Sequence, residues 1–90
     1  MNSENETLMQ FPCQFSVKAM GLASHDDFEA LVLEIVSNHV PDLEQDASRA
    51  RASKNGKYLS VTVTFQATSK AQLDAIYYAL TEHRDVLMSL

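Results

Sequence analysis

The stretch from Gly56 to Ala67, G-K-Y-L-S-V-T-V-T-F-Q-A, constrains the fold of this chain more than any other. From Leu59 to Ala67, apolar side chains recur at every second residue, and polar side chains alternate with them. Successive side chains of a β-strand point to opposite faces of the sheet, and Val, Thr and Phe favour pleated structure. The stretch therefore predicts a strand with one buried face and one polar face.

Two segments have the apolar spacing of three and four residues that marks one face of a helix. The first covers residues 24–39. Ser24 is its expected N-cap, and carboxylates fill its first turns, where they suit the positive end of the helix dipole. The second helix covers residues 69–83 and begins with a capping box formed by Ser69 and Gln72.

Three further segments predict strands. Residues 11–20 alternate clearly, and Gly21 is expected to end that strand. Residues 47–53 are a weaker candidate because they are rich in Ala and Arg. Residues 85–90 form a short last strand. Its apolar residues are expected on one face: Val86, Met88 and Leu90.

The sequence K-N-G-K predicts a β-hairpin with a two-residue loop at residues 55–56. Asn and Gly both accept positive φ, which a type I′ turn requires. A loop of this length fixes the register of the strands on either side, and that register agrees with the pattern of polar and apolar faces. The expected partners are Lys54 with Lys57, Ala52 with Leu59, Arg51 with Ser60, Ala50 with Val61 and Arg49 with Thr62.

The element order is therefore β-α-β-β-α-β. With right-handed crossovers, this order predicts an α+β ferredoxin-like sandwich, a four-stranded antiparallel sheet in the order 4-1-3-2 with two helices on one face. Residues 10–90 are expected to form this single domain, and the polar, acidic residues 1–9 a flexible N-terminal tail.

Composition narrows the functional class. The chain of 90 residues carries a net charge of −5, which argues against a nucleic-acid binder, because phosphate contacts need clustered Lys and Arg. Cys13 is the single cysteine, so no intramolecular disulfide can form. No segment resembles a signal peptide or a membrane span, and the three histidines have no metal-ligand spacing. We therefore expect a cytoplasmic protein with no metal site and no cofactor.

The polar face of the sheet is the first candidate site. One interpretation is a docking surface for an anionic ligand or an acidic protein; the other is a solvated face whose charges protect an edge strand from aggregation. RNA-recognition domains share this topology, but they stack bases on aromatic side chains that are mostly missing here. The candidate interaction residues are Lys18, Arg49, Arg51, Tyr58 and Thr62.

The turn after the first strand is the second candidate site. A glycine before a helix N-terminus can let a small ligand approach backbone N–H groups. The alternative is a simple strand-to-helix turn. The candidate ligand-binding residues are Met20, Gly21, Leu22 and Ser24.

Five stretches resemble the YbeD-like family of small bacterial proteins, also called domain of unknown function 493. They are F-P-C-Q-F-S-V-K-A-M-G at 11–21, I-V-S-N-H at 35–39, S-K-N-G-K-Y-L-S-V-T-V-T at 53–64, Q-L-D-A-I-Y-Y-A-L at 72–80 and V-L-M-S-L at 86–90. The resemblance implies a fold close to that of ACT domains, which sense amino acids, often pair their sheets edge to edge and bind effectors near the loop after strand one. It implies no catalytic residues.

We therefore expect a regulatory or interaction module rather than an enzyme. Its possible partners are a second copy, a metabolic enzyme or a small-molecule effector. One alternative is an accessory factor or adaptor in lipoate or acyl-transfer metabolism, because family genes lie beside lipoate-attachment genes in some bacteria. Cys13 and His25 would then be the only candidate nucleophile and base. Another alternative is a pure protein-binding partner that uses the sheet face and the hairpin.

Overall fold

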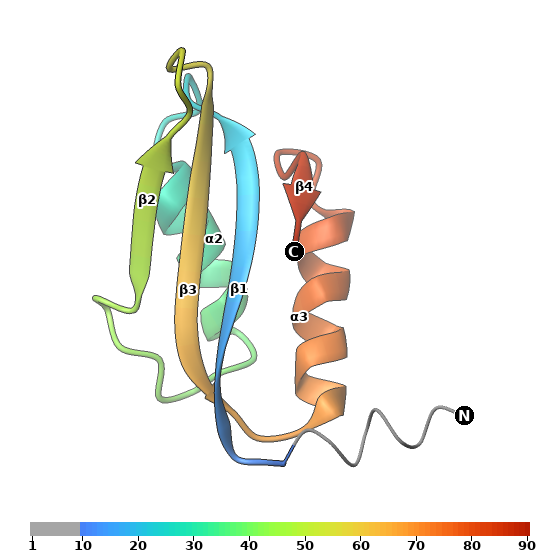
Figure 1. The fold of residues 1–90 in the computed structure, drawn as a ribbon. Coiled ribbons are helices and arrows are strands. Elements are labelled where there is room, and N and C mark those ends of the chain that lie inside the picture. Colours follow the sequence, from blue (N-terminus) through green and yellow to red (C-terminus); the bar gives the residue numbers. More distant parts are fainter. Residues whose placement is uncertain (1–9) are drawn as a thin grey trace.

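The structure, a computed structural model, describes residues 10–90. The tail predicted for residues 1–9 lies outside the described residues. The elements follow the predicted β-α-β-β-α-β order (Figure 1). They are β1 (Cys13–Leu22), α2 (Phe28–Ser37), β2 (Ser48–Ala52), β3 (Tyr58–Ala67), α3 (Lys70–Glu82) and β4 (Met88–Ser89).

The four strands form one antiparallel sheet in the order β2-β3-β1-β4. Read from the other edge, this is the predicted order 4-1-3-2, so the ferredoxin-like architecture is confirmed. The two central strands pair along ten residues, from Cys13 opposite Ala67 to Leu22 opposite Tyr58. In Figure 1, α2 crosses behind the sheet and α3 runs beside β4.

A single hydrophobic core fills the space between the sheet and the two helices. The central strands contribute the alternate residues that the sequence pattern assigns to the buried face, while the intervening residues form the open face. Cys13 packs against this core as a partly buried side chain. The fully buried core residues are Val17, Ala19, Phe28, Val32, Val36, Val61, Val63, Ala67, Ile76 and Leu80.

The first helix is shorter than predicted. It begins at Phe28, and its N-cap is Asp27, which has a left-handed φ of 63° and makes no side-chain capping hydrogen bond. Ser24 is therefore not the N-cap. The physical reason is that β1 continues to Leu22, so the following residues must reverse the chain before a helix can start; the N–H of His25 donates to the Leu22 carbonyl within this turn.

Gly21 does not end the first strand, as the sequence had suggested. It lies inside β1 opposite Leu59 and is buried. A Cβ atom at this position would lie 2.5 Å from Cε1 of Phe28, far inside van der Waals contact. Glycine is therefore required here because the first aromatic ring of α2 packs directly on the strand backbone.

The register of the β2–β3 hairpin is confirmed for four of the five expected pairs, but the turn type is not, and the expected pair of Lys54 with Lys57 is missing because both residues lie in the loop. Gly56 has a φ of 77°, whereas Asn55 does not have the positive φ that a type I′ turn needs. The backbone N–H of Ser53 donates to the carbonyl of Tyr58, which closes a loop of four residues, 54–57, instead of two. Both loops are centred on the same point, so Ala52 still pairs with Leu59 and Arg49 with Thr62.

The start of the second helix agrees with the predicted capping box in part. Ser69 is the N-cap, and its Oγ accepts a hydrogen bond from the N–H of Gln72. The Gln72 side chain accepts from the N–H of Thr68 rather than from that of Ser69. Its Nε2 also donates to the carbonyl of His39, 2.8 Å away. Gln72 therefore joins the start of α3 to the chain that follows α2.

The last strand is shorter than predicted and its residues do not share one face. Val86 lies in the turn before β4, where its N–H donates to the carbonyl of His83. Its side chain is buried. Met88 pairs with Met20 on the open face and is 53% exposed, and Leu90 is 67% exposed. The alternation begins only after the turn, which separates Val86 from the other two.

We expect Gly21→Ala to lower the free energy of unfolding by about 1–3 kcal/mol, because the new methyl group overpacks the Phe28 ring. Urea denaturation measures this loss. Phe28→Leu removes the ring atoms in question, so the double variant should lose less stability than the sum of the two single variants. Strictly additive losses would contradict the packing explanation.

Candidate functional site

The sheet register brings the predicted interaction residues together on the open face. Lys18 on β1 pairs with Thr62 on β3, and Thr62 pairs with Arg49 on β2. These three residues form one row across three strands. Neighbouring strands lie about 4.8 Å apart, so the two cationic residues are anchored about 10 Å from each other, with a hydroxyl between them.

The rows beside it hold the other predicted residues. Arg51 pairs with Ser60, which pairs with Met20. Tyr58 pairs with Leu22, and the Nζ atom of Lys57 lies 5.6 Å from the centroid of the Tyr58 ring. The open face therefore carries cations on β2 and, with Lys18, on β1, mostly hydroxyl groups on β3, and apolar side chains at β4.

No open-face position of the four described strands carries a carboxylate, although the chain has a net charge of −5. Lys18, Arg49 and Arg51 are exposed. Within residues 10–90, neither of the two ion pairs involves them. The open-face residues of the two central strands are Gln14, Ser16, Lys18, Met20, Leu22, Tyr58, Ser60, Thr62, Thr64 and Gln66.

A shallow hollow of about 470 Å³ lies next to Arg49 on this face. Thr62 and Thr64 line it, and the hydroxyl groups of Ser16 and Thr64 are hydrogen-bonded at 2.8 Å. A guanidinium beside several hydroxyl groups can hold a carboxylate through charge-assisted hydrogen bonds. Asp46 stands at the margin of the hollow and is the single carboxylate among its lining residues.

The structure separates the residues predicted to bind a ligand after β1. Met20 and Leu22 belong to the open face, whereas Gly21 is covered by Phe28 on the other side. Ser24 lines a different hollow of about 250 Å³ beside Arg84.

Two backbone donors of this loop are already used. The N–H of Ala23 donates to the carbonyl of Lys57, and that of His25 donates to Leu22. The loop therefore does not present these N–H groups to a ligand.

An ion pair that the sequence did not indicate links two segments at the end of the sheet where β1 stops. Nε2 of His25 lies 3.0 Å from Oδ2 of Asp85, and the two side chains are 30% and 37% exposed. The pair joins the loop after β1 to the turn before β4. The His25 ring packs edge-on against Phe28, and its Nδ1 is buried without a hydrogen-bond partner in the described chain.

The geometry of this pair limits its chemistry. The hydrogen bond to Asp85 raises the pKa of His25 above 6.5, and this outweighs the partial burial of the ring, which lowers it. Because Nδ1 is buried, it is not placed to take a proton from a substrate.

Cys13 begins the ten-residue strand that His25 follows, so the two residues lie about 30 Å apart and share no site.

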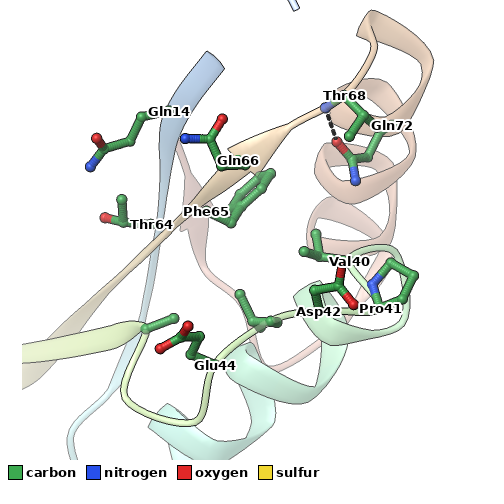
Figure 2. A pocket seen from close by; sticks show the side chains of 12 residues that line it. Gln14, Val40, Pro41, Asp42, Glu44, Thr64, Phe65, Gln66, Thr68 and Gln72 are labelled. Atoms are coloured by element: carbon green, nitrogen blue, oxygen red, sulfur yellow. Dashed lines mark hydrogen bonds between the residues drawn. The ribbon is translucent and has the colours of Figure 1, made fainter. Parts of the chain in front are cut away.

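A cleft of about 500 Å³ lies at the end of the sheet away from His25 (Figure 2). Its floor includes Phe65 and Val40, and the carboxylates of Asp42 and Glu44 stand at its rim. None of its lining residues is Lys, Arg or His, so it suits a neutral or cationic group. Sequence patterns missed this cleft because three distant segments form it. The remaining lining residues are Gln14, Pro41, Leu43, Ala47, Thr64, Gln66, Thr68 and Gln72.

No group of three or more His, Cys, Asp or Glu side chains within residues 10–90 is placed to hold a metal ion. In the same range, no helix has the length and apolarity needed to cross a bilayer.

We expect Asp85→Asn to lower the pKa of His25, because it removes the carboxylate that stabilises the imidazolium. A raised folded-state pKa stabilises the fold below the unfolded pKa, and this contribution is lost as pH rises through the folded pKa. The stability gap between wild type and Asp85→Asn should therefore be wider at pH 5.5 than at pH 8.5. NMR titration and urea denaturation measure these effects. Asp74→Asn is the control and should leave the His25 titration unchanged.

The chain matches one protein family and its relatives over nearly its whole length. Residues 6–90 match the family described as "Protein of unknown function (DUF493)". A UPF0250 protein of Nitrosomonas europaea is 46% identical over 85 residues, which is 94% of this chain and 97% of that protein. A UPF0250 protein of Chromobacterium violaceum is 43% identical over 90 residues, which is 100% of both chains.

A solved structure supports the architecture independently. Protein HP0495 from H. pylori superposes with a TM-score of 0.70, covering 91% of this chain and 85% of that one. At 16% identity, this likeness concerns the fold alone. The family match and the two relatives go further: the chain belongs to the DUF493 (UPF0250) family.

Proposed function

We propose that this protein is an interaction module that docks an acidic surface of a partner protein on the open face of its sheet. The observation that carries the proposal is the row Arg49–Thr62–Lys18, together with Arg51 in the next row. Its cations are exposed and have no carboxylate partner in the described chain. A partner's carboxylates would complete this row.

The charge distribution of the molecule favours an acidic partner over other anions. The open face concentrates positive charge on a protein that is negative overall, so a partner's carboxylates would be steered to this face and repelled elsewhere. A nucleic acid needs more phosphate contacts and aromatic stacking than this face offers, because its central positions are Ser, Thr and Lys.

The apolar end of the face gives the partner a second point of contact. Leu22 and Met88 are 44% and 53% exposed and lie on the side of the face away from the arginines. Contacts to both ends would fix the orientation of a partner, whereas cations alone would only attract it.

The double substitution Arg49→Glu/Arg51→Glu should abolish partner capture, because it places carboxylates where the proposal requires cations. The immobilised protein is incubated with cell lysate at low salt, and bound proteins are quantified by mass spectrometry. Proteins retained by wild type should be acidic, should elute as salt increases, and should fall at least tenfold on the double variant.

Lys54→Glu/Arg84→Glu is the matched control. It changes the net charge by the same amount, but at the hairpin loop and in the turn before β4. This control should retain the proteins that wild type retains. Equal losses on both variants would mean that only net charge matters, and undiminished capture by the Arg49/Arg51 variant would overturn the proposal.

A further inference from the structure

The exposed large hydrophobic side chains of residues 10–90 gather around one edge of the sheet. Four of the five lie on β4, next to it, or at the end of β1: Leu22, Leu87, Met88 and Leu90, with exposed fractions from 44% to 67%. The fifth, Tyr78, is one helical turn from Thr81, whose hydroxyl lies 3.5 Å from that of Ser89. Both faces of the β4 edge are therefore flanked by apolar surface.

The two edges of the sheet are protected differently. The β2 edge carries two exposed arginines, Arg49 and Arg51, which is a usual way to prevent one edge strand from pairing with another. The segment 86–90, V-L-M-S-L, has no charged residue and no proline. The β4 edge thus lacks the charges and prolines that oppose pairing, and its shortness, two residues, is its one protective feature.

The hydrogen bonds of β4 show which backbone groups are free to pair. Lys18 and Leu90 exchange two hydrogen bonds, of 2.9 and 2.8 Å, so the N–H and C=O of Leu90 point toward β1. Successive residues of a strand direct these groups to opposite sides. The N–H and C=O of Ser89 therefore point outward from the sheet.

We propose that a second copy of this chain pairs with β4 in antiparallel orientation, with Ser89 opposite Ser89 of the second copy. This pairing satisfies both outward groups of each Ser89 at once. It places Met88 of each copy directly opposite Leu90 of the other on the open face, at a position where side chains of antiparallel strands come closest. The two sheets join into one, and the arginine edges remain free at its two ends.

A second copy fits this edge better than an unrelated strand. One donor and one acceptor on the same residue are matched by a two-fold axis midway between the two copies of that residue, which makes the contact self-complementary and closes it at two chains. Pairing of two β2 edges would instead place like charges together, since a two-fold axis there brings arginines against arginines.

The dependence on salt separates this proposal from the acidic-partner function. Two copies with a net charge of −5 each repel one another, so added salt should strengthen their association. Docking of an acidic partner on the basic rows should weaken under the same change. The two proposals can therefore fail independently.

Sedimentation equilibrium of the full chain at 50 and 500 mM NaCl tests the pairing. The mass should rise from 10.0 kDa toward twice that value with concentration, and more readily at high salt. Ser89→Pro removes the outward N–H but none of the bonds to β1, and should weaken association at least tenfold. Ser89→Ala keeps that N–H and should associate as wild type does.

Leu90→Lys is the second variant, needed if Ser89→Pro disturbs the fold by circular dichroism. It puts a charge beside Met88 of the second copy and should also weaken association at least tenfold. Arg49→Glu/Arg51→Glu should still dimerise. A mass of 10.0 kDa at millimolar wild-type concentration, or undiminished dimers in the folded Ser89→Pro or Leu90→Lys variants, would overturn the proposal.

Discussion

The antiparallel ladder between β1 and β3 is the constraint on which the rest of the structure depends. Ten residues of each strand are paired, and the side chains of both strands alternate strictly between the two faces. A slip of one residue would expose Val17 and Val63 and bury Lys18, so the register is strongly specified. Once the ladder is set, one face must receive both helices and the other stays open.

The length of this ladder also determines the local structure at its end. Because β1 extends to Leu22, the chain needs a turn before α2, and Asp27 adopts a left-handed conformation to make it. The first residue of the helix, Phe28, then lies on Gly21 and beside His25. The ion pair between His25 and Asp85 follows from this arrangement, since it links the same turn to the segment that leads into β4.

The charge distribution gives the two edges of the sheet different properties. Carboxylates occupy α2 and the connection after it, whereas the open face near β2 is cationic. The other edge is neutral and apolar. A sheet of four strands has two edges and one uncovered face. In this protein Arg49 and Arg51 make the β2 edge and the adjoining part of the open face cationic, whereas the β4 edge is apolar. The two contacts that we propose with other chains use different surfaces, one basic and one apolar, and this chemistry distinguishes them.

The sequence by itself determined the element order, the sheet order and the faces of the central strands, because these depend on local periodicity and on connection rules. It also placed Lys18, Arg49, Arg51, Tyr58 and Thr62 on one face, since a hairpin register and a two-residue period are enough to do so. Only the tertiary structure decided where α2 begins, why residue 21 is glycine and which side chain pairs with His25. Those outcomes depend on contacts between segments far apart in the chain, such as His25 and Asp85, and on how tightly Phe28 packs against a strand, which no local pattern encodes.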